Sequence, residues 1–443
     1  MGKFFGTDGV RGVFGSELTI DFALKIGQAA AFVLSRPGEK ILIGCDTRIS
    51  SSSLVSAIAA GICSAGVESI LLETAVPTPA VAFLTKYTAC SAGAMISASH
   101  NSFEFNGIKF FDRNGFKLND ETEKKIENLI LEDFKNCKFP SFDNVGRIHF
   151  KNNLFEHYIE YISNVVTCNK KIKIAFDCAN GSSYCCADKI FGKKLNSEFI
   201  SCSPNGININ QNCGSTDLKN IKKLVIRKKI DIGIAFDGDA DRCIAVDENG
   251  ETIDGDEILA ICALDMFEND NLSKKTVVGT DMTNMGLTDF LKKLGINFVR
   301  TNVGDRYILD EMNKNNFSLG GEQSGHIIFL NNSTTGDGLL TAAMLINVIT
   351  KRNIKASEIK KIFVKYPQIT YNIKFEPYQK ILENPNFKDM ISKIETILSD
   401  LGRVFVRKSG TEPLVRIMCE SKYSEKLAEA EKIIKTFKDS CEV

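Results

Sequence analysis

Three carboxylates at alternate positions stand directly after an apolar segment of the chain. They are Asp237, Asp239 and Asp241; they follow Ile230–Phe236, and Arg242 comes next. Charges this close repel one another unless a cation lies among them. A small set of carboxylate oxygens, without nitrogen or sulfur donors, suits Mg²⁺. The pattern therefore predicts a magnesium site.

An EF-hand calcium loop is the competing interpretation of the same residues. The alternate carboxylates fit its spacing, and Glu248 stands at the twelfth position. Its sixth position requires Gly for a sharp turn, but here it is Arg242. Cys243–Val246 is apolar and continues as a strand, so the segment does not lie between two helices. We expect magnesium rather than calcium.

A second polar segment combines a hydroxyl, an imidazole, an amide and an ammonium. It reads Ile96-Ser-Ala-Ser-His-Asn101 and continues to Asn106-Gly-Ile-Lys109, and we expect one loop to hold all four groups. A phosphorylated nucleophile at Ser99, with His100 and Lys109 beside it, would use this combination. Ser and Asn are also ordinary turn residues, so this segment alone fits a plain turn equally well.

Two further loops carry ligand-binding chemistry. Gly320-Gly-Glu-Gln-Ser-Gly-His326 offers Glu322, Gln323 and Ser324 as partners for sugar hydroxyls, and its glycines allow close approach to the backbone. Arg407-Lys-Ser-Gly-Thr-Glu-Pro413, with Arg416 beyond it, offers guanidinium groups, hydroxyls and free amides for a phosphate. A plain turn and a solvated basic turn remain the alternative interpretations.

The positions of the histidines and the absence of other known motifs limit the reactions that the sequence supports. Two of the four histidines, His100 and His326, lie in these loops, whereas His149 and His157 suit surface or packing positions. Asp46-Thr-Arg48 and Gly336-Asp-Gly338 are further polar turns with a weak signal. The chain lacks GxxxxGK[ST], a GxGxxG that opens a helix, and HExxH, which argues against nucleoside triphosphates, dinucleotides and zinc peptidase chemistry.

Composition describes an ordinary globular chain of several domains. Its 443 residues exceed what one core supports, and Lys plus Arg equal Asp plus Glu at 55 each. This balance gives no positive field for nucleic acid or an anionic membrane. No apolar run reaches the roughly 18 residues of a membrane span, so we expect a cytoplasmic protein. The 14 cysteines are scattered through apolar stretches and suit reduced core positions.

The order of apolar and amphipathic segments predicts an α/β fold in several units. Short β-branched runs alternate with longer amphipathic ones through most of the chain, which is typical of parallel sheets covered by helices. The last 70 or so residues have a different rhythm that indicates a small α+β domain. We place the domains at residues 1–152, 153–254, 255–367 and 368–443.

These motifs, in this order, resemble the α-D-phosphohexomutase superfamily along essentially the whole chain. FGTDGVRG, SASHN, DGDADR, GEQSGH and RKSGTEP together resemble the branch that acts on glucosamine phosphate. The resemblance implies three mixed-sheet α/β domains and a C-terminal α+β domain around a central cleft. It also implies a cytoplasmic homodimer that feeds UDP-N-acetylglucosamine and cell-wall synthesis.

The resemblance also assigns roles to residues. It implies phosphoserine at Ser99, with its phosphate beside the three aspartates on Mg²⁺, and a hexosamine or hexose 1,6-bisphosphate as activator and intermediate. It implies assistance to proton transfer or charge stabilisation by Arg11, Lys109 and His326. The sugar-binding and phosphate-binding residues that it implies are Glu322, Gln323, Ser324, Arg407, Ser409, Gly410 and Thr411.

Two departures and several alternatives stay open. Ser102 replaces a common Pro after SASHN, and Asn302 replaces a Lys before VGDRY, which can loosen the serine loop and alter substrate contacts respectively. A phosphomannomutase or phosphoglucomutase is the alternative within the superfamily, and Gln323 is the residue that discriminates against it. A silent sugar-phosphate-binding protein and a magnesium-dependent phosphatase are the alternatives from other classes.

Overall fold

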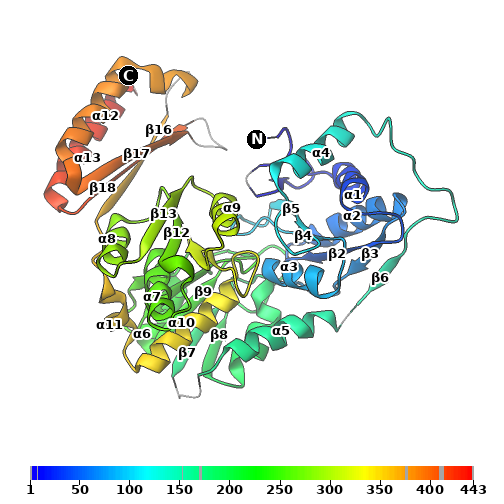
Figure 1. Cartoon of the computed structure of the whole chain (residues 1–443), viewed down its shortest axis with the longest axis horizontal. Helices are drawn as coiled ribbons and strands as arrows, with labels where there is room; N and C mark the ends of the chain where they lie inside the picture. Colours follow the sequence, from blue (N-terminus) through cyan, green and yellow to red (C-terminus); the bar gives the residue numbers. More distant parts are fainter. Residues whose placement is uncertain are drawn as a thin grey trace. The chain divides into compact units, whose positions relative to one another are not determined.

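The fold is described by a computed structural model that covers residues 2–6, 8–151, 153–168, 172–374, 378–408 and 414–441 (Figure 1). The chain divides into two compact units. The first holds residues 1–280 and 299–362, and the second holds residues 281–298 and 363–443. None of the described helices combines the length and the apolar character that crossing a bilayer requires.

The first sheet is six-stranded, with the order β1-β5-β4-β2-β3-β6. Its strands are β1 (Val10–Val13), β2 (Lys40–Cys45), β3 (Glu68–Leu71), β4 (Ala92–Ile96), β5 (Phe105–Asp112) and β6 (Ile148–Phe150). The neighbouring helices are α1 (Ile20–Leu34), α2 (Ser51–Ser64), α3 (Thr78–Tyr87) and α4 (Asp120–Leu131). The pairs among β4, β2, β3 and β6 are parallel, whereas β5 runs antiparallel to both β4 and β1. Ile26, Ile43 and Ile58 are fully enclosed in the core between this sheet and its helices.

The second sheet is five-stranded, with the order β11-β10-β9-β7-β8. Its strands are β7 (Lys173–Asp177), β8 (Asn196–Ile200), β9 (Ile232–Phe236), β10 (Cys243–Asp247) and β11 (Thr252–Ile253), with helices α5 (Leu154–Val165) and α6 (Lys219–Lys228). Phe176 stacks on Phe191, Phe199 and Phe236 in its core. β10 continues directly from the aspartate loop, and Glu248 accepts from Ser357 instead of closing a calcium loop.

The third sheet is four-stranded, with the order β13-β12-β14-β15. Its strands are β12 (Thr276–Thr280), β13 (Asn297–Thr301), β14 (Leu319–Gly321) and β15 (Ile327–Phe329). The helices of this part of the sequence are α7 (Gly255–Glu268), α8 (Met285–Lys293), α9 (Asp305–Asn315), α10 (Gly338–Arg352) and α11 (Ala356–Ile359). α10 buries most of its surface, which suits its almost continuous apolar sequence.

The C-terminal sheet is antiparallel, with the order β16-β18-β17. Its strands are β16 (Gln368–Lys374), β17 (Gly402–Lys408) and β18 (Leu414–Ser421), and its helices are α12 (Pro385–Leu398) and α13 (Ser424–Cys441). Short helical turns elsewhere span Ser182–Cys185, Asp188–Gly192, Ser273–Lys275, Lys360–Ile362, Tyr378–Glu383 and Ser399–Leu401. Ile373, Ile394 and Ile417 lie in the core of this part. The predicted fold class, mixed α/β sheets followed by an α+β part, is confirmed.

One local prediction was wrong. Asn106 and Lys109 do not share a loop with Ser99, because Phe105–Asp112 is strand β5. Ile108 and Phe110 of this strand are buried in the core, so the side chain of Lys109, at the position between them, points to the opposite side of the sheet. Lys109 is therefore fixed by a strand rather than carried by a turn.

Asp337 joins three elements near the sugar loop. Its carboxylate caps α10 by accepting from Leu340 N at 2.9 Å, and it accepts from the Tyr158 hydroxyl of α5 at 3.0 Å. The adjacent Gly336 N–H donates to His326 Nε2 at 3.2 Å. Burial raises the pKa of Asp337 to about 7, because the charged form has lost its hydration.

We predict that Asp337→Asn removes a pH dependence of stability. The folded protein binds this proton more tightly than the unfolded chain does, so the stabilisation is fully present below the ordinary pKa of aspartate and is lost as the pH rises through about 7. The apparent Tm of the variant minus that of the wild type, both measured by circular dichroism, should therefore increase from pH 5.5 to pH 8. The exposed Asp270→Asn is the control, and parallel curves for all three proteins would contradict the prediction.

Candidate active site

Ser99 lies in the turn after β4 in a left-handed conformation. Its φ is +51°, and the residue is 1% exposed. Its N–H donates to Ser97 Oγ at 2.9 Å, and its own hydroxyl donates to Asp237 Oδ2 at 2.7 Å. His100 Nδ1 lies 3.3 Å from the same hydroxyl. A direct hydrogen bond therefore joins Ser99 to one of the three aspartates.

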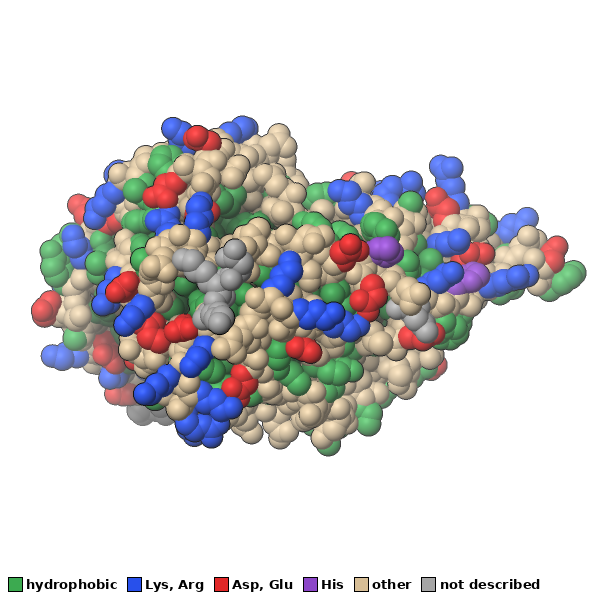
Figure 2. Space-filling model, turned by 90° about the horizontal axis from the view of Figure 1, so that it is seen from below, with side chains coloured by type: hydrophobic (Ala, Val, Ile, Leu, Met, Phe, Trp, Pro, Cys, Tyr) green, Lys and Arg blue, Asp and Glu red, His purple; other side chains and the backbone are tan. Residues whose placement is uncertain are grey.

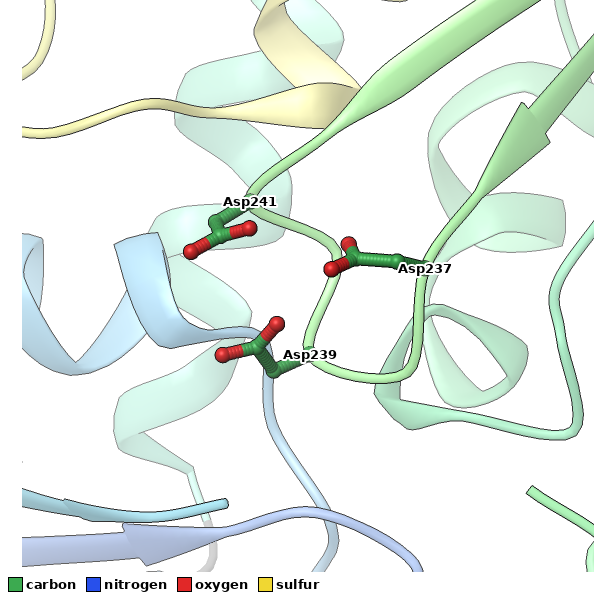
Figure 3. A group of neighbouring side chains, drawn as sticks. All are labelled: Asp237, Asp239 and Asp241. Atoms are coloured by element: carbon green, nitrogen blue, oxygen red, sulfur yellow. The ribbon is translucent and has the colours of Figure 1, made fainter. Parts of the chain in front are cut away.

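The three aspartates converge in the loop between β9 and β10, with their carboxylates facing a common centre (Figure 3). All three are buried, and one oxygen from each lies within 4.8 Å of the others. Asp239 Oδ1 and Asp241 Oδ1 are buried without a hydrogen-bond partner among the described residues. Unsatisfied anionic oxygens are costly inside a protein, so this oxygen-only set fits a divalent cation.

The remaining oxygens of the triad are already occupied by protein donors. Lys109 Nζ lies 3.1 Å from Asp239 Oδ2 and 3.6 Å from Asp241 Oδ2. Thr78 Oγ1, at the start of α3, donates to Asp239 Oδ2 at 2.6 Å. Each of these two carboxylates thus has one oxygen held by the protein and one left for a ligand.

Burial and charge set different protonation tendencies within the triad. Burial, together with Asp241 and Asp239, raises the pKa of Asp237 well above its ordinary value. Burial also opposes the charge of Asp241, but Lys109 and His326 outweigh it and hold the pKa of that carboxyl well below its ordinary value. Burial, Arg242 and Arg11 lower the pKa of His100 to about 4, so its imidazole is neutral at neutral pH.

Cations from the first sheet surround these carboxylates. Lys109 also pairs with Asp8 at 3.0 Å, and Arg11 of β1 pairs with the same carboxylate. Arg11 Nη1 donates to Ala98 O at 3.3 Å, which places it beside the serine turn. Burial lowers the pKa of Lys109, but Asp239 and Asp8 outweigh it and raise the net value. Lys109 is therefore a permanent cation.

The sugar-loop candidates lie between β14 and β15. Gly325 is in a left-handed conformation, and a Cβ there would meet Cys243 O at 2.3 Å, so only glycine fits. Glu322 Oε1 accepts from Gly304 N at 3.2 Å, and burial and Asp305 raise its pKa. Ser324 Oγ is buried without a hydrogen-bond partner in the described part of the chain. The backbone of Gln323 accepts from Gly255 N at 3.0 Å.

His326 and Arg242 connect this loop to the triad. His326 is buried, and its Nδ1 lies 3.7 Å from Asp241 Oδ2. Arg242 Nε lies 4.0 Å from Asp237 Oδ2 and 3.9 Å from Asp241 Oδ1. The structure therefore brings together the predicted residues of the first unit: Arg11, Ser99, His100, Lys109, Asp237, Asp239, Asp241, Arg242, Glu322, Gln323, Ser324 and His326.

The predicted phosphate loop belongs to the second unit. Arg407 of β17 pairs in register with Arg416 of β18, so the two guanidinium groups arise from neighbouring strands at the same level. Ser409, Gly410 and Thr411 lie outside the described residues. Two arginines at one end of a hairpin suit the binding of an anion.

Sequence reasoning missed several charged residues in the first unit. Lys117 is nearly enclosed and pairs with Asp8 at 2.7 Å and with Asp305. Asp305 Oδ2 in turn lies 3.4 Å from His326 Nε2. Lys117 lies in no motif that the sequence offered, whereas Asp8 stood inside the segment FGTDGVRG and Asp305 inside VGDRY, without a role assigned to either.

Four family models match successive parts of the chain. They describe phosphoglucomutase/phosphomannomutase alpha/beta/alpha domain I at residues 2–136, domain II at 156–250, domain III at 254–366, and the C-terminal domain at 345–435. Together they extend over almost the whole chain.

Curated relatives and solved structures agree with these models. Proteins named phosphoglucosamine mutase from Acetivibrio thermocellus and Clostridioides difficile are each 47% identical, over 97% and 95% of both chains respectively. A phosphoglucomutase/phosphomannomutase family protein from Burkholderia thailandensis has a similar fold, with a TM-score of 0.82 at 20% identity over 98% of this chain and 96% of its own. An N-acetylglucosamine-phosphate mutase, described as a member of the α-D-phosphohexomutase superfamily, gives 0.67 at 18% identity over 98% and 96%. The chain therefore belongs to the phosphoglucosamine mutases, within the phosphoglucomutase/phosphomannomutase family.

Proposed function

We propose that the chain interconverts glucosamine 6-phosphate and glucosamine 1-phosphate through phosphorylated Ser99. The observation that carries the proposal is the 2.7 Å hydrogen bond from the Ser99 hydroxyl to Asp237, inside the buried aspartate triad. It places a nucleophile against a group built to hold a cation. The names of relatives that are 47% identical over nearly the full chain support the substrate.

Each transfer exchanges a phosphoryl group and a proton between Ser99 and the sugar. The phosphoryl group leaves Ser99 Oγ and bonds to the free hydroxyl oxygen of the sugar monophosphate, while the proton of that hydroxyl passes to Ser99 Oγ, which gives the serine hydroxyl and the 1,6-bisphosphate. The bisphosphate then turns and returns its other phosphoryl group to Ser99 Oγ, and the serine proton passes to the sugar oxygen that the phosphoryl group leaves. Positioning and charge stabilisation account for most of the catalysis in such transfers.

The residues of the first unit take complementary roles. Asp237, Asp239 and Asp241, with the phosphate on Ser99, would hold Mg²⁺, which supplies charge neutralisation when bound. Lys109, Arg11 and Arg242 stabilise charge around the reacting group, and His100 and His326 lie where they can hold or move a proton. EF-hand calcium binding finds no support here.

The remaining loops would hold the substrate. Glu322, Gln323 and Ser324 suit hydroxyl groups of the sugar, and the buried Ser324 hydroxyl offers an unused donor. Arg407, Ser409, Gly410, Thr411 and Arg416 suit the phosphate that is not reacting. We also propose domain boundaries near residues 152, 254 and 367, activation by a hexosamine or hexose 1,6-bisphosphate, and a cytoplasmic homodimer.

A parallel substrate assay tests the proposed function. Glucosamine 6-phosphate, glucose 6-phosphate and mannose 6-phosphate are converted with Mg²⁺ and a trace of glucose 1,6-bisphosphate, and kcat/KM is compared. We expect the amino sugar to be preferred. Preference for mannose or glucose phosphate would support the phosphomannomutase or phosphoglucomutase alternative, and release of inorganic phosphate alone would support a phosphatase.

Replacement of the nucleophile gives a direct prediction. Ser99→Ala should lose the added mass of about 80 Da that a phosphoryl group contributes, together with nearly all turnover, because no other hydroxyl occupies this position. Intact-mass spectrometry and the mutase assay measure both effects. The exposed neighbour Ser102→Ala should keep the added mass. Turnover by Ser99→Ala at the wild-type rate would rule out the phosphoserine mechanism.

Metal dependence gives a second prediction, at Asp237. Without Mg²⁺, Asp237→Asn should leave the apparent Tm unchanged or raise it, because the substitution removes a buried charge that the triad repels. Mg²⁺ at about 100 times its Kd should stabilise the wild type by about 2.7 kcal/mol and the variant far less. Differential scanning fluorimetry with Asp217→Asn as control measures this. An equal Mg²⁺ response in both proteins would contradict a cation site at the triad.

A further inference from the structure

Arg48 is enclosed completely behind the serine turn and uses every N–H of its guanidinium. Nε donates to Asp46 Oδ2 at 2.8 Å. The other donors all reach backbone carbonyls of residues 99–105: Nη2 reaches Ser99 O at 3.0 Å and Asn101 O at 2.9 Å, and Nη1 reaches Phe105 O at 2.9 Å and also Ser102 O. One side chain thus gathers four carbonyls of the turn that carries the nucleophile.

Asn210 donates hydrogen bonds to two of the same carbonyls. It lies in the segment that follows β8, and its Nδ2 donates to Ser99 O at 2.9 Å and to Asn101 O at 3.0 Å. A carbonyl oxygen has two lone pairs, so both oxygens are saturated by Arg48 and Asn210 together. The backbone N–H of Asn210 is tied in turn to Ala179 O at 2.9 Å, which anchors the side chain to the β7 loop.

Asp46 connects Arg48 to the backbone N–H of Ser99. Its Oδ2, which binds Arg48, also accepts from Ser97 Oγ at 2.6 Å, and Ser97 Oγ accepts from Ser99 N at 2.9 Å. The N–H of Ser99 is therefore connected to Asp46 through Ser97, and the carbonyl of Ser99 is bound directly by Arg48, so both backbone groups depend on the buried Asp46–Arg48 pair. The left-handed conformation of Ser99 is unfavourable for a residue other than glycine, and it persists only where its surroundings enforce it.

We propose that Arg48 and Asn210 are positioning residues for phosphoryl transfer, which fix the Ser99 turn so that its side chain faces the aspartate triad. This inference rests on the proposed function. The Ser99 carbonyl faces Arg48 and Asn210 while its hydroxyl faces Asp237, so rotation of the turn would break hydrogen bonds at both ends. A lysine at position 48 has one nitrogen and cannot reproduce this fork.

Two variants and two matched controls test the inference. Asn210→Ala removes the side-chain amide with its two donated hydrogen bonds, places Ala at a left-handed position (φ +58°) and leaves the Arg48–Asp46 pair in place. The variant therefore stays informative if Arg48→Lys fails to fold, and its apparent Tm reports the cost of the backbone strain. Arg113→Lys, at an exposed arginine that pairs with Glu39, is the control for Arg48→Lys. Asn220→Ala, at an exposed asparagine that donates to Asn212 O, is the control for Asn210→Ala.

Four quantities are measured on the full chain: kcat and KM for glucosamine 6-phosphate, the ³¹P resonance of phospho-Ser99 after loading with glucose 1,6-bisphosphate, and the apparent Tm. We expect kcat per phosphorylated molecule to fall roughly 100-fold in Arg48→Lys and at least tenfold in Asn210→Ala, since small misplacements of a reacting group have effects of this size. KM should stay within about threefold, because neither residue is placed against the sugar. The ³¹P resonance should shift or broaden in both variants and in neither control.

The outcomes separate this inference from the function on which it rests. An inactive wild type would overturn the proposed function and the inference with it. An active wild type, together with variants that keep kcat and the ³¹P resonance, would overturn only the positioning role. Losses of kcat that merely follow the folded fraction, with an unmoved ³¹P resonance, would make Arg48 and Asn210 structural residues and would also overturn it.

Discussion

Mutual repulsion of three buried carboxylates is the constraint around which the first unit is organised. Asp237, Asp239 and Asp241 cannot share one enclosed loop without compensation, and the protein compensates them only in part. Lys109 reaches one oxygen each of Asp239 and Asp241, while their other oxygens have no hydrogen-bond partner among the described residues. This incomplete compensation is what a cation site requires. If protein cations paired with every carboxylate oxygen, the site would gain little from a metal ion. If no protein cation paired with the carboxylates, their repulsion would destabilise the folded state.

The compensating charges come from elements far apart in the sequence, which ties the sheets of this unit together electrostatically. Lys109 extends from the first sheet to the aspartate loop of the second, and His326 reaches the same loop from the third. Lys117 continues the network to Asp305 at the start of α9. On the outer surface the pattern differs, since basic and acidic side chains lie interspersed on the face shown in Figure 2. The buried charges around the triad thus form one network, whereas on this face side chains of opposite sign alternate.

This division explains what the sequence could predict. Ser99, the aspartates and Glu322 all stand in polar loops directly after apolar strands, so chain order alone places them at the same edge of their sheets. The sequence placed Lys109 in a loop because a charged side chain between Ile108 and Phe110 suggests a turn. Its partners Asp8 and Asp239, which explain a lysine in a buried strand, are visible only in the structure. Lys117 and Asp305 are 188 residues apart, and nothing in the sequence around either residue indicates such a distant partner. Arg48 stood in a recognised polar turn, but nothing in that turn indicates four carbonyl acceptors.

The contrast between a fixed nucleophile and a turning substrate follows from the same contacts. In the proposed reaction the two phosphates of the bisphosphate must exchange places relative to Ser99. The serine turn cannot perform this movement, because the N–H and the carbonyl of Ser99 are both anchored to the Asp46–Arg48 pair. Its carbonyl is also anchored by Asn210, in the segment that follows β8. The triad is equally fixed, since Thr78 and Lys109 hold Asp239. The reorientation therefore belongs to the bisphosphate, which must turn within a site whose reacting groups stay in place.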